Sequence, residues 1–422
     1  GYCSFDLSVE EHYLSNGMKV ISLEKPNVSV VAFAIYYRVG SIDEIPGKTG
    51  LAHYCEHMMF KTTQNLEGES FARLLGAVGG GHSNANTSLD RTCYHETVPA
   101  DRLELVIRLE AERMANLQPT PEEAAKELEV VKEELRLNYL DDPEGRLRFE
   151  LYQHAFDKHP YRTITIGKLQ DVSGITYDDL MAFQRQYYCP ANAFAVVVGN
   201  FETEKLLNLM ETFFGSITPG KRRLEDYPVE EEQAIEKRFV IDMPVRKPSY
   251  RAGYKIPGAQ NPDNLALQVL CAILSRGGST PLGRLSQGED PVAMYAFAYC
   301  RPSLDPELLI MGGVPLSGVT PEMLETRIDE VIQNIVDEGI TQNQLDKARQ
   351  QLLAQTVYGM QSSMGIAFSL GEAEIVGSWK DSLSLEEKLD KLTVHDINSV
   401  ARKYLKVSNR TVGIVQNRST LP

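Results

Sequence analysis

Short runs of apolar, β-forming residues separated by a turn signal occur near the start of the chain. His12-Tyr13-Leu14 and residues 19–23 flank Asn16-Gly17, a dipeptide typical of type I′ turns in β-hairpins. Residues 28–37 then form a run rich in β-branched and aromatic side chains, apolar enough for a central strand. The pattern therefore predicts a hairpin followed by a buried strand.

Longer segments with helical periodicity follow. Residues 50–60 are mostly apolar, which predicts a largely buried helix. We expect further helices around Ser70–Leu75 and over Asp101–Leu117, with a strand over Ser83–Glu96 between them. Another helix should begin at Thr120, which is a good N-cap and is followed by Pro at the first position and Glu at the third.

One long segment occurs twice in the chain. Residues 176–200 recur as residues 393–417 at a constant offset of 217, and both copies predict a helix that leads into a final strand. The matching positions are Thr176 and Thr393, Asp179 and Asp396, Tyr187 and Tyr404, and Asn192 and Asn409. The chain is thus a duplication of two similar halves and not a solenoid of short repeats.

The duplication predicts an α+β fold of two homologous domains. Each domain should be a mainly antiparallel sheet covered by helices. We expect an N-terminal domain over residues 1–218 and a C-terminal domain over residues 233–422. The segment 219–232 between them contains Pro219-Gly220, a basic triplet, and Pro228 followed by three glutamates, as expected of an exposed linker.

Composition and charge narrow the function classes. With 42% hydrophobic residues over 422 positions, the chain is long enough for two or more domains. A net charge of −15 argues against nucleic acid and anionic membrane surfaces as partners. No run approaches 18 consecutive apolar residues, so we expect no membrane span. The six cysteines contain no C-x-x-C pair, which argues against a disulfide scaffold or a cysteine zinc site. Because the chain begins with Gly, we expect that a leader or tag has been removed.

Three side chains capable of metal chemistry lie within residues 50–60. His53 and His57 are four residues apart and share one helix face, where two neutral imidazoles can bind one Zn²⁺. Glu56 is close enough to reach a water at the metal without being a ligand. This H-x-x-E-H order is the inverse of H-E-x-x-H, and both are typical of zinc peptidases. The alternative of two surface histidines conflicts with the apolar flanks, because buried histidines need partners.

A peptidase zinc needs a third protein ligand and an open fourth position. We expect the third ligand from a second helix, because one helix face offers only two good positions. Glu127 and Glu134 are seven residues apart and share a face, whereas Glu133 points elsewhere. In isolation, these glutamates would equally suit a solvated helix face.

Together these motifs resemble the pitrilysin/insulinase family of zinc metallopeptidases, in the two-domain form typified by mitochondrial processing peptidase and its bacterial relatives. In that family E-x6-E follows H-x-x-E-H after a little over seventy residues, and here 134 − 57 = 77. The resemblance implies that His53, His57 and Glu134 bind zinc. It makes Glu56 the general base and Glu127 a supporting carboxylate in catalysis. Matches at residues 14–18, 40–44 and 80–88 extend the resemblance over nearly the whole chain.

The resemblance also indicates where a peptide would bind. Asn84, Ala85 and Asn86 would lie on an edge strand, whose free backbone groups can pair with an extended peptide. Asparagines in a polar turn are the alternative. In the family, the C-terminal domain carries an Arg/Tyr pair, seven residues apart, that holds the substrate backbone. Tyr295 matches the tyrosine, but the arginine position is Gly288, so Arg284 is the available substitute.

The sequence of the second half contains no H-x-x-E-H motif and predicts no metal site. Its only histidine is His395. Alignment of the corresponding helices places Ala348 opposite Glu127 and Gln355 opposite Glu134. One half has therefore kept the ligands, which suggests that the other contributes substrate contacts.

The resemblance predicts a zinc-dependent endopeptidase with one Zn²⁺ per chain. Its substrates would be unfolded peptides or presequence-like segments, enclosed in a clam-like chamber of two two-domain units. The missing arginine predicts the zinc subunit of a heterodimer with a homologous metal-free partner. A homodimer or monomer in which Arg284 stands in is the alternative. The alternatives to a peptidase are a catalytically silent core subunit and a peptide-binding chaperone of the same fold. We expect a bacterial periplasmic protein, with the cytoplasm as the alternative.

Overall fold

The computed structural model describes residues 7–77 and 82–418, which form two compact units. Unit 1 contains the chain up to Leu135 together with Thr163–Tyr227 and Tyr358–Leu383. Unit 2 contains Arg136–Arg162, Pro228–Val357 and the chain from Ser384 onward. Gly80 and Gly81, which belong to one of the matched segments, lie outside the described residues.

Unit 1 is built on a six-stranded sheet with the strand order β1-β2-β6-β3-β5-β4. Only the β2–β6 pair is parallel. The central strands β3 and β6 are almost wholly buried, which explains their apolar runs. The strands are β1 (Glu10–Tyr13), β2 (Lys19–Glu24), β3 (Val30–Tyr37), β4 (His82–Thr87), β5 (Thr92–Pro99) and β6 (Ala193–Gly199). The predicted hairpin and central strand are thus confirmed.

The turn of that first hairpin is not the predicted type I′ turn. Gly17 has a φ of +86°, but no other residue type in the described chain has a positive φ, whereas type I′ needs two such residues. The Gly17 N–H donates to the Leu14 carbonyl at 2.8 Å, and the Leu14 N–H donates to the Met18 carbonyl at 2.9 Å. These bonds define a type I turn with a glycine bulge. The Asn16 side chain instead donates to the Phe214 carbonyl at 2.8 Å.

The single strand predicted over Ser83–Glu96 is also wrong, because two antiparallel strands, β4 and β5, occupy it. The chain reverses at Ser88–Arg91, where the Ser88 N–H donates to the Arg91 carbonyl at 2.8 Å. The Ser88 hydroxyl accepts from the Asp90 N–H at 3.2 Å. Ser and Asp favour turns through such local bonds, so Ser88-Leu89-Asp90 is the signal for this turn in the sequence.

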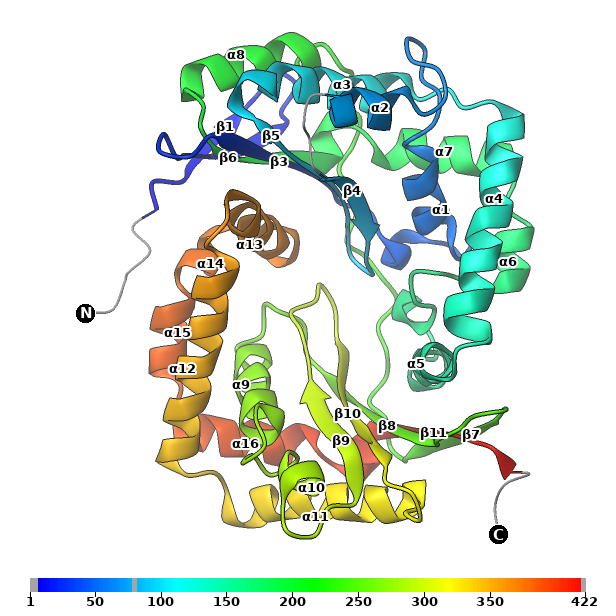
Figure 1. The fold of residues 1–422 in the computed structure, drawn as a ribbon, viewed down its shortest axis with the longest axis vertical. Helices are drawn as coiled ribbons and strands as arrows, with labels where there is room; N and C mark the ends of the chain where they lie inside the picture. Colours follow the sequence, from blue (N-terminus) through cyan, green and yellow to red (C-terminus); the bar gives the residue numbers. More distant parts are fainter. Residues whose placement is uncertain (1–6, 78–81, 419–422) are drawn as a thin grey trace. The chain divides into compact units, whose positions relative to one another are not determined.

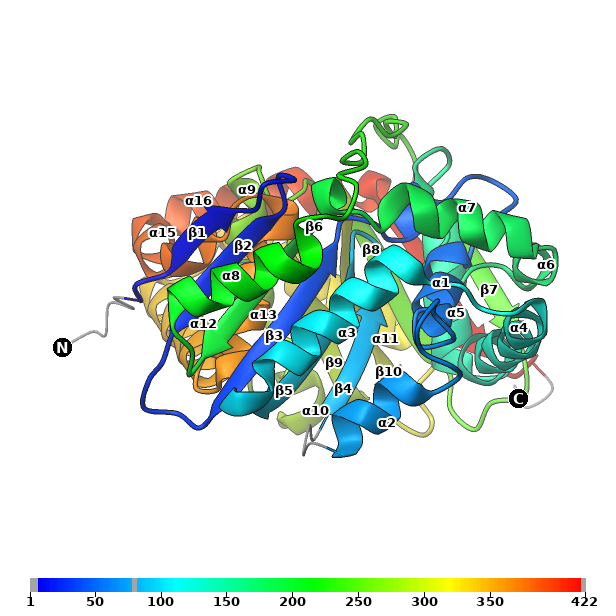
Figure 2. The ribbon, with the colours of Figure 1, turned by 90° about the horizontal axis from the view of Figure 1, so that it is seen from above.

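Helices cover both faces of the first sheet (Figures 1 and 2). Helices α3 and α8 lie on one face, and α13 packs on β3 and β6 from the other. Residues Ile366, Ala367 and Leu370 of α13 share an apolar cluster with Tyr36 and Phe194. The helices of this unit are α1 (Leu51–Met58), α2 (Ser70–Ala77), α3 (Leu103–Asn116), α4 (Pro121–Leu135), α6 (Leu169–Ser173), α7 (Tyr177–Tyr187), α8 (Thr203–Phe214), α13 (Ser363–Val376) and α14 (Lys380–Leu383).

Unit 2 repeats this plan with a five-stranded sheet in the order β7-β11-β8-β10-β9. Its strands are β7 (Lys237–Asp242), β8 (Ser249–Ile256), β9 (Ala293–Tyr299), β10 (Glu307–Pro315) and β11 (Arg410–Gln416), and only β7–β11 is parallel. Helices α9, α11 and α16 form the main core with this sheet, whereas α5 contacts β7, β8 and β11. The helices are α5 (Pro143–Ala155), α9 (Asp263–Ser275), α10 (Arg284–Gln287), α11 (Pro321–Glu338), α12 (Gln342–Gly359), α15 (Leu385–Lys391) and α16 (Val394–Tyr404).

The predicted duplication is visible in matched hydrogen bonds. Both repeated helices begin with a Thr/Asp capping box. After the first, the Asn192 amide donates to the Tyr187 carbonyl at 2.9 Å and to the Arg38 carbonyl at 3.1 Å. After the second, the Asn409 amide donates to the Tyr404 and Lys255 carbonyls, both at 2.9 Å. The fold is therefore the predicted pair of sheet-and-helix domains.

Each sheet receives one covering helix from the other half of the sequence. Helix α13 follows α12 in the second half but belongs to unit 1, and α5 follows α4 in the first half but belongs to unit 2. The compact units are therefore a different division of the chain from the predicted domains 1–218 and 233–422. Part of the segment predicted as an exposed linker is also packed, because Arg223 is buried and pairs with Asp43 at 3.0 Å.

The contact between α13 and the first sheet gives a test of this arrangement. A Cβ at Gly371 would lie 2.2–2.8 Å from atoms of the buried Tyr36 side chain. We expect Gly371→Ala to lower the free energy of unfolding by about 1–3 kcal/mol through overpacking. The measurement is the midpoint of urea denaturation.

Gly76→Ala is the matched control. Gly76 also lies inside a helix, α2, but a Cβ there meets nothing within 4 Å. Because alanine favours the helix by about 1 kcal/mol over glycine, this variant should be as stable as the parent or more so. Equal stability of the two variants would contradict the packing of α13 on Tyr36.

Candidate metal centre

Helix α1 separates a buried side from a chemically active side. Leu51, Tyr54, Cys55 and Met58 are buried, whereas the intervening His53, Glu56 and His57 stay partly accessible. This division follows from the i, i+3, i+4 spacing of a helix. The active side chains are thus anchored from behind by an apolar face.

A buried carboxylate holds the N-terminus of α1. The N-cap residue Gly50 has no side chain that could accept a hydrogen bond, and Glu44 takes this role. Its Oε2 accepts from the Ala52 N–H at 2.8 Å, which satisfies one of the free backbone donors at the start of the helix. Complete burial raises the pKa of Glu44 to about 8.

Helix α4 begins as predicted and is fixed against α1. The Thr120 hydroxyl accepts from the Glu123 N–H at 3.1 Å, and Glu123 accepts from the Thr120 N–H at 2.8 Å. The Tyr54 hydroxyl of α1 donates to the Ala124 carbonyl of α4 at 2.6 Å. This bond joins the two helices that carry the candidate ligands.

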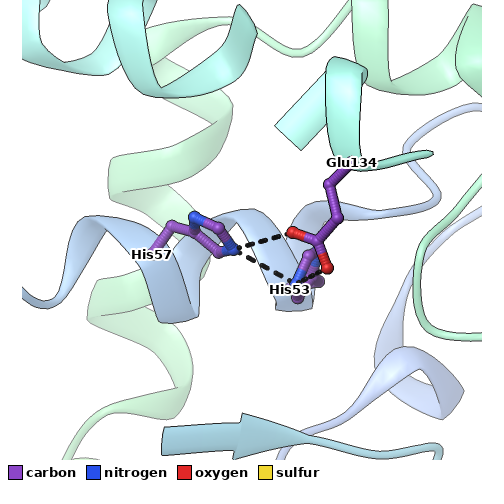
Figure 3. A group of neighbouring side chains, drawn as sticks. All are labelled: His53, His57 and Glu134. Carbon is purple, nitrogen blue, oxygen red and sulfur yellow. Dashed lines mark hydrogen bonds and ion pairs between the residues drawn. The ribbon is translucent and has the colours of Figure 1, made fainter. Parts of the chain in front are cut away.

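His53, His57 and Glu134 converge on one point (Figure 3). The two Nε2 atoms lie 3.2 Å apart, and the carboxylate oxygens of Glu134 lie 3.7 Å from His53 Nε2 and 3.4 Å from His57 Nε2. Tetrahedral ligands 2.0–2.1 Å from one zinc ion are roughly 3.3–3.4 Å apart. The three groups therefore fit a single zinc ion, and Glu133 is exposed and absent from the group.

Glu127 fixes the ring of His57. Its Oε1 lies 2.8 Å from His57 Nδ1, and its Oε2 lies 2.9 Å from the Lys61 ammonium. When Nδ1–H donates to Glu127, Nε2 presents its lone pair toward His53 and Glu134. The hydrogen bond with His57 holds the pKa of Glu127 at about 2.

The surroundings favour positive charge between the imidazoles and Glu134. Burial, reinforced by His57, lowers the pKa of His53 to about 4, which keeps that imidazole neutral. Burial also opposes a charge on His57, but hydrogen bonds with Glu127 and Glu134 outweigh it and raise its pKa to about 9. A divalent cation would supply positive charge at the place where these carboxylates favour it.

Glu56 is held apart from this group. Its Oε2 accepts a hydrogen bond from the Thr87 hydroxyl of β4 at 2.5 Å. Burial raises the pKa of Glu56, and the bond from Thr87 partly offsets that rise. Thr87 thereby connects helix α1 with strand β4.

The predicted edge strand is present. β4 pairs only with β5, so its other edge has no strand partner among the described residues. The Ala85 N–H donates to the Asn84 side chain at 2.8 Å. The Asn86 side chain accepts from Arg91 in the β4–β5 turn. A peptide that pairs with Ala85 would displace the Asn84 side chain, whereas Asn86 is already engaged.

Tyr295 belongs to unit 2. It lies on β9, the edge strand of the second sheet, opposite Val314 of β10, and it is 44% exposed. Gly288 ends the short helix α10, where its N–H donates to the Arg284 carbonyl at 2.9 Å. Arg284 is exposed at the start of the same helix.

Sequence reasoning assigned no role to several residues of this centre. Glu44 and Thr87 lay within matched segments, but their partners, Ala52 and Glu56, depend on tertiary packing. The Lys61 contact with Glu127 had only a weak signal, because lysines are frequent on helix ends.

Two family profiles match most of the chain. The one described as "Insulinase (Peptidase family M16)" matches residues 19–168, and "Peptidase M16 inactive domain" matches residues 174–352. The chain is 30% identical over 404 residues to the zinc protease PqqE of Helicobacter pylori, across 94% of this chain and 90% of that protein. The chain belongs to peptidase family M16, the insulinase family.

Further proteins are similar to the chain over nearly their whole length. An uncharacterised zinc protease of Mycobacterium leprae is 26% identical over 416 residues, covering 97% of this chain and 92% of that protein. The crystal structure of a protease from Helicobacter pylori has a TM-score of 0.92 at 28% identity, covering 97% of this chain and 99% of that one. A Pseudomonas fluorescens structure titled "peptidase M16 inactive domain" shares the fold, with a TM-score of 0.85 at 19% identity, over 97% of this chain and 98% of that one.

The convergence at Glu134 generates a test that needs no substrate. We expect Glu134→Gln to lose most bound zinc, because an amide is a poorer ligand than a carboxylate. Glu133→Gln is the matched control and should retain about one zinc per chain, since residue 133 is rotated by roughly 100° on the helix. Metal analysis of the two purified proteins decides. Loss of zinc only from the Glu133 variant would contradict the assignment.

Proposed function

We propose that this chain is a zinc-dependent endopeptidase in which His53, His57 and Glu134 bind the metal. The observation that carries the proposal is the spacing of the three ligand groups, whose nitrogen and oxygen atoms lie 3.2–3.7 Å apart and suit one zinc ion. The names of the M16 relatives support the same reading, because several are called zinc proteases. None of the helices in the described residues is long and apolar enough to cross a membrane.

The residues around the metal take separate roles in this proposal. When bound, zinc would acidify a water molecule and polarise the scissile carbonyl. Glu56 would be the general base, whose carboxylate takes a proton from the attacking water and returns it to the leaving amine. Thr87 holds the Glu56 carboxylate by its hydrogen bond, and Glu127 fixes the tautomer and orientation of His57.

The substrate in this proposal is an extended peptide added to the edge of β4. Ala85 and its neighbours would pair with the peptide backbone, and Thr87 on the same strand contacts Glu56. Pairing along β4 would therefore bring the peptide past the general base. Tyr295 is the proposed contact from the second half.

Two other classes remain as alternatives for an M16 chain. A silent core subunit would use the fold without chemistry, and a peptide-binding chaperone would use the β4 edge without cleavage. The description of one matched profile as an inactive domain is compatible with either. The intact set of His53, His57, Glu134 and Glu56 favours the peptidase over both.

Removal of the general base separates these classes. We expect Glu56→Gln to retain zinc and the fold but to lose at least about 100-fold in hydrolysis of a flexible peptide, because it removes proton transfer and keeps the ligands. Parallel metal analysis and peptide cleavage assays measure both properties. A folded but zinc-free variant would mean that Glu56 is itself a ligand. An inactive zinc-loaded parent chain would favour the silent subunit or the chaperone.

We also propose that the chain is the zinc subunit of a heterodimer with a homologous metal-free partner. The motivation is Gly288, which stands where the family's substrate-binding arginine is expected. Without that arginine, the substrate carbonyl is poorly held for attack. The alternative is a homodimer or monomer in which Arg284 takes over.

The heterodimer is tested by adding the missing component. We expect the chain alone to cleave a flexible peptide slowly and to gain at least about tenfold when the product of a neighbouring homologous gene without H-x-x-E-H is added. Arg284→Ala measured on the chain alone is the control for the alternative. Full activity from the chain alone, abolished by Arg284→Ala, would favour the homodimer or monomer.

A further inference from the structure

Unit 2 contains a cavity of about 300 Å³ at the position that the metal centre occupies in unit 1. The strand registers establish the correspondence. Ala195, Ile35, Tyr94 and Ala85 are neighbours across the first sheet, and Val412, Ala252, Met311 and Ala298 are neighbours in the same order across the second. β4 therefore corresponds to β9, and Cys300 follows Ala298 by two residues, as Thr87 follows Ala85.

The helix walls correspond as well. Gln355 of α12, which aligns with Glu134, lines the cavity. On the opposite wall, α9 presents Gln268, Cys271 and Ala272, with the same i, i+3, i+4 spacing as the H-x-x-E-H residues of α1. Cys271 thus takes the place of Glu56, and Cys300 takes the place of its partner Thr87.

The hydrogen-bonded Glu/Thr pair of one half is therefore replaced by two thiols in the other. Their Sγ atoms lie 3.9 Å apart, and both cysteines are free. Ser275 keeps α9 and β9 in place, because its hydroxyl lies 3.1 Å from the Cys271 carbonyl and 3.0 Å from the Ala298 carbonyl. A dithiol at this distance needs a further approach of roughly 1.9 Å to reach disulfide bonding distance.

We propose that Cys271 and Cys300 are a reversible redox modification site, which small aliphatic disulfides oxidise to an intrachain disulfide. Cys271 is buried in the helix core, whereas Cys300 is partly accessible just after β9, the edge strand. Cys300 is therefore the residue that reagents reach, and it lies one residue beyond the paired part of β9.

The chemistry balances without any further reagent. The Cys300 thiolate attacks the small disulfide and forms a mixed disulfide, releasing one thiol. The Cys271 sulfur then attacks the Cys300 sulfur and releases the second thiol. The two cysteines together lose two protons and two electrons, and the small disulfide is reduced to two thiols. Burial raises the pKa of the Cys271 thiol, so the partly accessible Cys300 is the residue that reacts first with the small disulfide.

The product would tie α9 to the end of the strand that carries Tyr295. The disulfide closes a loop between residues 271 and 300, which restricts the unfolded chain. We therefore expect a rise in the thermal midpoint of on the order of 5 °C. This property lies outside the proposed peptidase chemistry and should also hold in Glu56→Gln.

The test treats the folded full-length chain with cystamine. We expect two thiols fewer per chain by thiol titration after unfolding, a linked pair of peptides containing Cys271 and Cys300 by mass spectrometry, and reversal by dithiothreitol. Cys300→Ser should lose all three effects together with the thermal shift. Cys189→Ser, which replaces a buried cysteine of unit 1, is the control and should keep them.

Several outcomes would overturn the proposal. One is a folded chain that keeps both thiols, and another is a stable cystamine adduct on Cys300 that never passes to Cys271. A linkage that pairs other cysteines would do the same. If Cys271→Ser does not fold, Cys300→Ser alone decides, because Cys300 lies outside the regular strand and is only partly buried. Peptide hydrolysis plays no part in these readouts, so their failure leaves the peptidase proposal untouched.

Discussion

The hydrogen bond from Tyr54 to the Ala124 carbonyl fixes the spacing between α1 and α4, and the candidate metal centre depends on that spacing. Two ligands come from α1 and the third from α4, so no single helix can form the site. A shift of about 1 Å between them would remove Glu134 from the 2.0–2.2 Å range of a zinc–oxygen bond. The pairing of Glu127 with His57 adds a second connection between the same helices.

The candidate site could be predicted where its information is local in the sequence. The spacing of His53, Glu56 and His57, and that of Glu127 and Glu134, depends only on the period of one helix. The roles of Glu44 and Thr87 could not be predicted, because their contacts join segments that are separate along the chain. The prediction of a type I′ turn at Asn16-Gly17 is wrong for a related reason. The Asn16 side chain bonds to the Phe214 carbonyl, and this tertiary contact outweighs the local preference of the dipeptide.

The overall fold could be predicted because the repeat is visible in the sequence itself. The division of the chain into compact units could not be predicted. The offset of 217 between the two copies carries the duplication, and matched amide bonds at Asn192 and Asn409 reproduce it in space. The sequence pattern of a covering helix does not indicate which sheet the helix packs on. Helices α5 and α13 would need an apolar face in either unit. The two halves have kept the strand registers and changed the side chains, so one frame supports imidazoles and carboxylates, and its copy supports thiols and amides.

The assignment of α13 to unit 1 has a consequence for synthesis on the ribosome. The strands β1 to β6 are complete once residue 199 has emerged, but the helix that covers their second face begins only at Ser363. Until then an apolar surface around Tyr36 and Phe194 has no native partner, and exposed surface of this kind favours aggregation. Synthesis from the N-terminus therefore leaves this face of the first sheet uncovered until most of the second half has been made.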